Sequence, residues 1–478
     1  MNKPIRRVAF VAMIMFGLLL ANGTYMMIVR QNSLAEAPQN RRVRDAEFAQ
    51  NRGAILAAGK IKIATTEPAD DNFEFQRVYP EGELYAPITG YYSYDHSRTA
   101  LETSYNAQLA GTDDALFVRR LVDLMVGHTP EGASVQTTIV PKMQRAAAKA
   151  LGDQRGAVVA LDPKTGAVLA MVTSPSYDPN DIASHDIKAA DQAYNRLVND
   201  PTRPLANRAA REIYPPGSTF KLVTSAAALA DGKTADSKVK SPVRLKLPGT
   251  NTFLTNSGPC GGTEITITQA LKVSCNTAFA NLGLEMGEDK LREQARKFGF
   301  DSRHLADLGG AASRFPDKVD DAQLALSSIG QFDVAASPLQ MAMVTAGIAN
   351  DGVLMDPYLV SMVQAPDLKP LETHRPEVLS TAMTPEHAAA LQQMMVVVVN
   401  EGTGRNAQIS GVEVGGKTGT AQSDPTRKPF AWFTSFAPLE DPKVAVAVIV
   451  EDADIPRDDI AGGRLAAPIA RAVMQAAL

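Results

Sequence analysis

The sequence has little of what marks a metal-binding or nucleic-acid-binding protein. Its 478 residues include two cysteines and six histidines, and the histidines lie far apart with no H-x-x-x-H pair or His/Cys cluster. We therefore expect no metal site, and no residue pattern calls for another cofactor. A formal net charge of −4 argues against a nucleic-acid partner, because such proteins carry a basic face.

One long uncharged segment stands at the N-terminus. Basic residues precede residues 8–29, which carry no charged side chain, and Arg30 ends the run. At ~1.5 Å per residue, a helix of this length reaches about 33 Å and spans a bilayer. A cleaved signal peptide has a shorter apolar core, with a small-residue cleavage site directly after it. The sequence predicts a cytoplasmic tip and single-pass membrane anchor over residues 1–33, with the catalytic part of the chain outside the cell membrane.

The remainder divides into two parts. Residues 34–150 mix short strand-like and helical pieces. From residue 156, two apolar strands flank a D-P-K-T-G turn, which is typical of a hairpin. Three strand-like runs and a closing helix follow near the C-terminus: 409–417, 432–436, 444–450 and 468–478. Strands at both ends that enclose helices predict one mixed α/β domain over 155–478.

Three short motifs each occur twice. They are S-x-x-K, S-x-N and K-T-G, and together they are the set known from penicillin-binding proteins and serine β-lactamases. The copies lie at 218–221 and 237–240, at 104–106 and 274–276, and at 164–166 and 417–419. Each motif alone is weak, so its surroundings must decide which copy carries the chemistry.

Ser218 is the expected nucleophile. It follows Pro-Pro-Gly and opens a stretch that should be helical until Gly232. Backbone N–H groups in a first helical turn are free to hold an oxyanion. Lys221 shares a helix face with Ser218 and, if buried, is neutral enough to take the serine proton. The rival Ser237 lies among lysines and a proline, in what reads as a solvated loop; the alternative for Ser218 is a simple helix cap.

Ser274 and Asn276 lie in a helical pattern at about 266–284. Serine and asparagine are poor choices inside a helix unless their side chains meet something. We expect Ser274 to pass a proton to the leaving group and Asn276 to hold the substrate amide or Lys221. The alternative is a Ser274 hydroxyl bonded to its own helix. The copy at Ser104 lies in the N-terminal part and is assigned to structure.

Lys417, Thr418, Gly419 and Thr420 follow a glycine-containing strand, and such glycines permit close approach of a ligand. Lysine and threonine there would bind a carboxylate, and the Thr420 N–H would complete an oxyanion hole. The copy at 164–166 is the hairpin turn. Gly411–Thr418 also matches the phosphate-binding loop G-x-x-x-x-G-K-[ST], which needs a helix directly afterwards. Prolines follow instead, so a nucleotide-binding loop is a remote alternative.

With these residues assembled, the chain resembles the class B, or monofunctional, penicillin-binding proteins, and within them the actinobacterial penicillin-binding protein A subgroup. The resemblance runs over nearly the whole length. It rests on R-G-A-I, R-V-Y-P-E-G, L-E-T-S-Y-N-A-Q-L-A-G, Y-P-P-G-S-T-F-K, S-P-L-Q-M-A, G-T-G, G-G-K-T-G-T-A-Q and G-G-R-L-A-A-P, which begin at 52, 77, 101, 214, 337, 402, 415 and 462. Ala100 and Phe332 stand where many members have glycine.

The resemblance implies a penicillin-recognising serine transpeptidase fold, with a five-stranded antiparallel sheet flanked by helices and an N-terminal pedestal or dimerisation-like domain. It implies that Ser218 attacks the penultimate D-Ala of a peptidoglycan stem peptide, releases the last D-Ala, and passes the acyl group to an amine on a neighbouring strand. β-Lactams would acylate the same serine. The family context further implies wall synthesis linked to division, with division or elongation proteins as partners.

Several alternatives stay open. A D,D-carboxypeptidase, a serine β-lactamase, and a non-catalytic scaffold or β-lactam sensor all share the motifs. No E-x-x-x-N occurs between Asn276 and Lys417, so the water-activating glutamate of a class A β-lactamase is not found and we expect slow deacylation. Cys260 and Cys275 either form a disulfide, as extracytoplasmic pairs often do, or leave Cys275 as a buried thiol.

Overall fold

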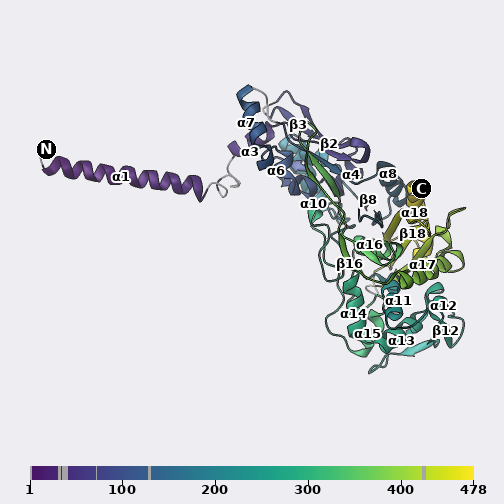
Figure 1. Cartoon of the computed structure of the whole chain (residues 1–478). Coiled ribbons are helices and arrows are strands. Elements are labelled where there is room, and N and C mark those ends of the chain that lie inside the picture. The colour runs from purple at the N-terminus through teal and green to yellow at the C-terminus, as the bar shows by residue number, and fades with distance from the viewer. Residues whose placement is uncertain (1–2, 31–33, 35–40, 72, 127–130, 423–426) are drawn as a thin grey trace.

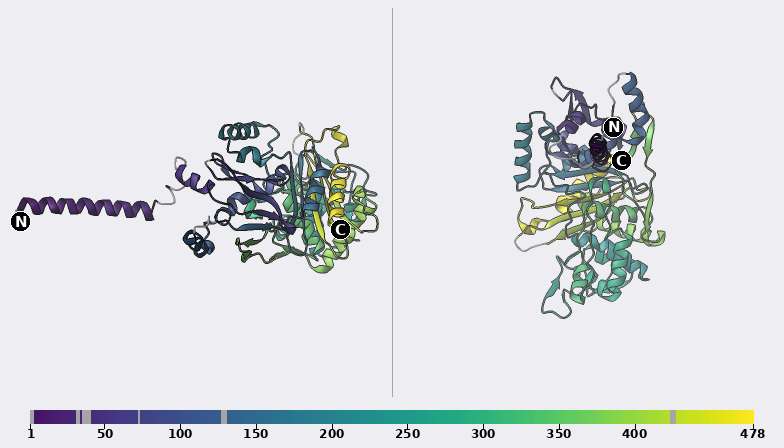
Figure 2. Two further views of the ribbon diagram at one scale, coloured as in Figure 1. Left: turned by 90° about the horizontal axis from the view of Figure 1, so that it is seen from above. Right: turned by 90° about the vertical axis from the view of Figure 1, so that its left-hand side faces the viewer.

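The structure is a computed structural model, and it describes residues 3–30, 34, 41–71, 73–126, 131–422 and 427–478. Helix α1, Lys3–Ile28, has no buried residue and stands apart from the body (Figure 1). The left view of Figure 2 shows the same projection. Among the described residues, α1 is the one helix long and apolar enough to cross a membrane. The structure thus has a candidate span where the sequence predicts one.

A six-stranded sheet occupies the end of the body nearest α1 (Figure 1). Its order is β15-β14-β6-β1-β2-β3, with bounds β1 Ile55–Ala57, β2 Ile61–Pro68, β3 Phe75–Val78, β6 Ser134–Thr137, β14 Val360–Gln364 and β15 Pro370–Thr373. Two strands therefore come from far beyond the segment 34–150 that the sequence assigned to this domain. The remaining elements of this end are α3 Arg41–Phe48, α4 Gly82–Thr89, β4 Tyr92–Ser93, β5 Ser97–Arg98, α5 Ala100–Ser104, α6 Asn106–Leu109 and α7 Phe117–Val126.

A buried ion-pair cluster explains three of the N-terminal motifs. Glu102 accepts from Arg52 Nε and from Arg77 Nε, each at 2.7 Å, and from the Tyr79 hydroxyl at 3.1 Å. Burial alone would raise the pKa of Glu102, but the two guanidinium groups hold it below its usual range. R-G-A-I, R-V-Y-P-E-G and L-E-T-S thus each supply one member of a single cluster.

The second sheet has five antiparallel strands in the order β17-β18-β19-β7-β8. Their bounds are β7 Gly156–Leu161, β8 Val168–Ser174, β17 Gly415–Ala421, β18 Phe430–Ala437 and β19 Val444–Val450. The expected hairpin at 156–174 and the five-stranded antiparallel sheet are present. The run at 409–417 is not one strand, however, because β17 begins at Gly415 and K-T-G lies inside it.

Both faces of this sheet are covered. Ala157 and Val159 belong to the core that includes α16, Pro338–Ala349, every residue of which is buried. Val158 and Ala160 face the other core, with α18, Gly462–Ala477, and α8, Pro141–Leu151. Alternate residues of one strand thus fill opposite cores. Because α8 packs on this sheet, the helix before residue 150 is structurally part of the catalytic domain.

A helical subdomain lies at the end of the body away from α1 (Figure 1). It contains α11 Lys221–Ala230, α12 Ile267–Lys272, α13 Asn276–Met286, α14 Glu288–Lys297, α15 Asp321–Ser327 and the short strands β9 Lys238–Lys240, β10 Arg244–Lys246, β11 Phe253–Thr255 and β12 Glu264–Thr266. Between the two regions run α9 Pro179–Ala183, α10 Ile187–Asn199, β13 Val353–Met355, β16 Val378–Thr381 and α17 Pro385–Asn400. The catalytic motifs meet where this subdomain joins the five-stranded sheet.

Candidate active site

Ser218 lies in a 3₁₀ turn, Gly217–Phe220, and α11 begins only at Lys221. The helix expected from residue 218 therefore starts one turn later. Side chains three residues apart lie one above the other in a 3₁₀ turn, which places Lys221 over Ser218. Two bonds fix the segment ahead of the serine: Trp432 Nε1–H donates to the Pro215 carbonyl at 3.0 Å, and the Gly217 N–H donates to the Gly330 carbonyl at 2.9 Å.

The nucleophile turn touches strand β17 so closely that two glycines are needed. A Cβ on Gly217 would lie 2.9 Å from the Ala421 Cβ and 3.0 Å from the Thr420 carbonyl oxygen, and its φ of +52° also disfavours a side chain. A Cβ on Gly419 would lie 3.0 Å from the Pro216 carbonyl oxygen. Close backbone approach therefore explains the glycines of both motifs.

Lys221 is fully buried and bonded to the S-x-N segment. Its Nζ donates to the Ser274 carbonyl at 2.7 Å, to Asn276 Oδ1 at 2.8 Å and to the Ser274 hydroxyl at 3.3 Å. Burial, with repulsion from Lys417, holds the pKa of Lys221 well below its usual range. A lysine in this state can accept a proton at neutral pH.

Ser274 is not inside a helix, and in this respect the sequence prediction of one helix over 266–284 is wrong. The chain breaks between α12 and α13, with Ser274 in the left-handed region at φ +58°. This conformation turns both its carbonyl and its hydroxyl toward lysines. The alternative, a hydroxyl bonded to its own helix, is not what the structure shows.

Lys417 approaches the same hydroxyl from β17. Its Nζ donates to Ser274 Oγ at 2.9 Å and to the Thr418 carbonyl at 2.8 Å. Burial lowers the pKa of Lys417 to about 7. The Ser274 hydroxyl therefore stands between two amines, each of which can give or take a proton near neutral pH.

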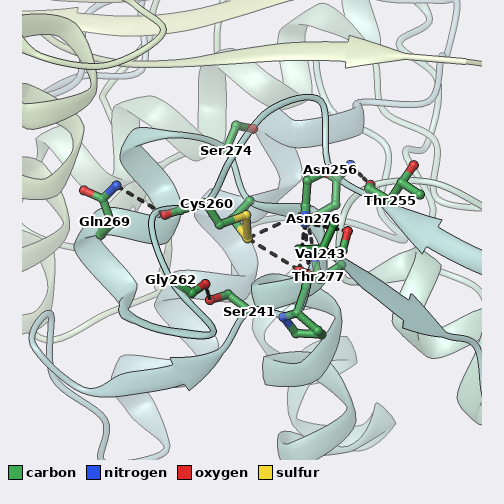
Figure 3. Close-up of a disulfide and its surroundings, with 12 residues drawn as sticks. Ser241, Val243, Thr255, Asn256, Cys260, Gly262, Gln269, Ser274, Asn276 and Thr277 are labelled. Atoms are coloured by element: carbon green, nitrogen blue, oxygen red, sulfur yellow. Dashed lines mark hydrogen bonds between the residues drawn. A yellow bond between two sulfur atoms is a disulfide. The ribbon is translucent and has the colours of Figure 1, made fainter.

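A disulfide joins Cys260 to Cys275, the residue between Ser274 and Asn276 (Figure 3). The two Cα atoms are 5.5 Å apart. The Thr277 N–H also donates to Asn256 Oδ1 at 3.0 Å, and the Asn276 side chain donates to the Thr255 carbonyl at 2.9 Å. The loop that precedes β12 is thus tied to the S-x-N segment by a covalent bond and by hydrogen bonds.

One cavity of about 360 Å³ opens onto these groups. The expected site residues that line it are Ser218, Ser274, Asn276, Thr418, Gly419 and Thr420. Lys221 and Lys417 lie beneath, bonded to Ser274 and fully buried. All three motif copies chosen from their surroundings therefore converge on one place.

Four lining residues were missed by the sequence reasoning: Ser257, Thr403, Arg405 and Arg464. The Thr403 and Thr418 hydroxyls lie 2.6 Å apart, so Thr403 orients a group that faces the cavity. The G-T-G at 402–404 and the G-G-R at 462–464 were noted only as family motifs. No chemical pattern within either segment points to the cavity, because each is brought there by folding.

The unused copies are structural. Ser104 donates to the Asp307 carbonyl at 2.6 Å, Lys164 lies in the β7–β8 turn, and Ser237 caps a turn by accepting from the Thr234 N–H at 2.9 Å. The phosphate-binding alternative at Gly411–Thr418 is wrong. Lys417 and Thr418 lie within β17 and pair with β18, so no helix follows them and no phosphate loop forms.

Comparison with known proteins agrees with this geometry. Residues 156–475 match the family model of the penicillin-binding protein transpeptidase domain, and residues 52–135 match that of the penicillin-binding protein A dimerisation domain. The chain is 46% identical to the peptidoglycan D,D-transpeptidase PbpA of Mycolicibacterium smegmatis, over 100% of this chain and 99% of the relative. Identity to PbpA of Mycobacterium tuberculosis is 45% over the same shares.

Solved structures give the same result. The ceftriaxone acyl-enzyme complex of penicillin-binding protein A from M. tuberculosis superposes with a TM-score of 0.88 at 44% identity, covering 91% of this chain and 100% of that one. A D,D-transpeptidase domain from Eggerthella lenta superposes with a TM-score of 0.78 at 32% identity, covering 90% and 98%.

Proposed function

Because the chain belongs to the penicillin-binding protein family, as a peptidoglycan D,D-transpeptidase that β-lactams acylate, we propose that Ser218 is its nucleophile and that Lys221, Ser274 and Lys417 move the protons. The observation that carries this assignment is the Ser274 hydroxyl, which both buried lysines contact at the cavity that Ser218 lines. No other copy of the motifs has such surroundings.

Acylation follows from these positions. Lys221 Nζ takes the Ser218 hydroxyl proton while Oγ bonds to the carbonyl carbon of the penultimate D-Ala. The backbone N–H groups of Ser218 and Thr420 stabilise the oxyanion. When the amide C–N bond breaks, the Ser274 hydroxyl gives a proton to the departing D-Ala amine, and Ser274 is reprotonated by a lysine ammonium. Ser218 is then esterified.

Transfer reverses these proton movements. An amine of a neighbouring stem peptide loses a proton through Ser274 to a lysine and attacks the ester carbonyl. The Ser218 oxygen leaves and recovers its proton from Lys221, and a new amide joins the two strands. Thr418, whose hydroxyl is fixed by Thr403, and the glycine-lined edge of β17 hold the peptide. Asn276 holds Lys221 and has a side chain at the cavity.

A donor peptide ending in D-Ala-D-Ala, supplied with a D-amino acid acceptor, tests the assignment. Ser218→Ala should form no cross-linked product, and Ser237→Ala, which removes the rival motif serine, should form it at the wild-type rate. Product from Ser218→Ala, or loss of product from Ser237→Ala alone, would reject Ser218 as the nucleophile.

The anchor places this reaction outside the membrane. α1 crosses the bilayer once and the body lies on the extracytoplasmic side, where stem peptides are found; the apolar, unburied α1 supports this topology. External protease should therefore digest the body in intact spheroplasts. A body protected from protease would reject the topology. The family context also supports partners from the division or elongation machinery, which copurification from solubilised membranes tests.

A further inference from the structure

Helix α7 exposes an unusual amount of apolar surface. Phe117, Val122, Met125 and Val126 are each more than half exposed. A helix on the surface of a water-soluble domain normally turns its apolar residues toward the core and its polar residues outward. Apolar side chains gathered on the outside of one helix instead mark a surface that contacts something else.

The neighbouring turn extends this surface. Arg119 of α7 forms an ion pair with Asp367 at 3.4 Å, which joins the helix to the turn between β14 and β15. The next residue, Leu368, is 65% exposed, and Lys369 follows it. We call the group formed by Phe117, Val122, Met125, Val126 and Leu368 the α7 patch. Its basic neighbours are Arg119, which also pairs with Asp123, and Lys369.

The topology puts the α7 patch at the end of the body where the chain arrives from the anchor. Asn51, which leads into β1, forms a parallel bridge with Glu131, which follows α7 and leads into β6. Figure 1 shows α7 beside α3 at this end, and the left view of Figure 2 agrees. From Ile28 to Arg41 the chain can extend to about 45 Å at most, so the anchor holds this end near the membrane surface.

We propose that the α7 patch lies on the outer surface of the lipid bilayer and that α7 is an interfacial helix which sets how the body stands on the membrane. The proposal rests on the anchor described above. Amphipathic helices with exposed aromatic and aliphatic side chains bind the headgroup boundary by burying those side chains. The anchor raises the effective concentration of bilayer at the patch, so a modest apolar surface is sufficient.

Charge at this end favours an apolar contact over attraction to anionic lipid. The β2–β3 hairpin, at the same end of the sheet, carries Asp70, Asp71 and Glu74. Acidic side chains there would be repelled by an anionic surface. Binding should therefore occur on zwitterionic lipid and should change little with salt.

A fluorescent probe on the full-length protein in phosphatidylcholine vesicles tests this placement. Met125→Cys is labelled with an environment-sensitive fluorophore, and no free cysteine competes because Cys260 and Cys275 are bonded to each other. Val243→Cys is the matched control, since Val243 is an 86% exposed aliphatic residue in the helical subdomain. Brominated lipid should quench the Met125 probe severalfold more than the Val243 probe, at low and at high salt.

The outcomes separate the patch from the anchor. Vesicles that carry the protein on flotation but leave the Met125 probe unquenched overturn the proposal, and so does quenching that requires a second membrane protein. Protein that fails to float with the vesicles overturns the anchor and the proposal with it. Val122→Asp should abolish quenching at position 125 while penicillin labelling, which reports folding, is retained; quenching that survives this change also contradicts the proposal.

Discussion

At the scale of single residues, the site depends on two lysines that are buried without a carboxylate partner. Both contact the Ser274 hydroxyl, and burial lowers the pKa of each. An amine so placed is costly to the folded protein, because desolvation disfavours its charged form. Two such groups in one cavity are therefore expected only where proton transfer is the function.

The rate of penicillin acylation should depend on pH through Lys221. Its deprotonated form is the base, and its pKa is lowered, so the rate should already be high at neutral pH and should fall as acid protonates the amine. Stopped-flow acylation from about pH 5 to about pH 9 measures this limb. Lys221→Ala should be slow throughout. A wild-type rate that rises only near the ordinary lysine pKa would contradict the assignment.

The acyl-enzyme should persist for a long time. Among the described residues that line the cavity, none is an aspartate or glutamate that could activate water. Benzylpenicillin should therefore label the protein stoichiometrically and be released far more slowly than it is bound. Rapid, multiple turnover of benzylpenicillin, followed by loss of its absorbance, would make the protein a β-lactamase instead.

The sequence predicted which residues form the site better than how they are held. Pro-Pro-Gly before Ser218 and the apolar run after it were sufficient to choose that copy of the motif. The left-handed break at Ser274 could not be predicted, since the apolar spacing of a helix continues across it and serine is not a residue that signals such a conformation. Thr403 could not be found because its role depends on a contact with Thr418.

At the scale of elements, the nucleophile turn and β17 function as one unit because their backbones touch. This contact predicts the effect of a single methyl group. Gly217→Ala would push Thr420 and Ala421 away from Ser218 and should slow acylation at least tenfold, since about 1.4 kcal/mol of lost transition-state stabilisation is sufficient. Gly232→Ala is the control, with φ +88° but nothing within 4 Å of the new Cβ. It should lose stability and keep the wild-type acylation rate; equal rates for the two variants would contradict the account.

Phe332 stores backbone strain on the loop that follows Gly330. It has φ +61°, is 48% exposed, and stands where relatives of the family carry glycine. The left-handed conformation costs a non-glycine residue ~1–2 kcal/mol, part of which glycine's flexibility in the unfolded chain offsets. Phe332→Gly should therefore raise the free energy of unfolding by ~0.5–1 kcal/mol in chemical denaturation. Phe332→Ala keeps the Cβ and should give no gain; an equal gain would show that strain is not the cause.

Element types followed from the sequence where the pattern was strong. The β7–β8 hairpin and the closing helix were predicted from apolar runs and turn residues. The bounds of β17 were not, because a strand that begins with two glycines and carries a buried lysine has no strand-like composition. Only pairing with β18 on one side makes those residues a strand.

At the scale of the whole molecule, the two regions are bound together by chain that crosses between them. β14 and β15 complete the N-terminal sheet, and α8 covers the catalytic sheet. No local pattern could predict this, since β6 and β14 are more than 200 residues apart in sequence and pair only after both regions fold. The body therefore transmits the position of the anchor to the active site through shared sheets rather than through a single linker.

The central claim is that one serine, Ser218, carries the acyl group. Peptide mass spectrometry of the protein after reaction with benzylpenicillin measures this directly. We predict one adduct, on the peptide that contains Ser218, and none in Ser218→Ala. An adduct on Ser237, Ser274 or Ser104, or labelling that survives Ser218→Ala, would contradict the account.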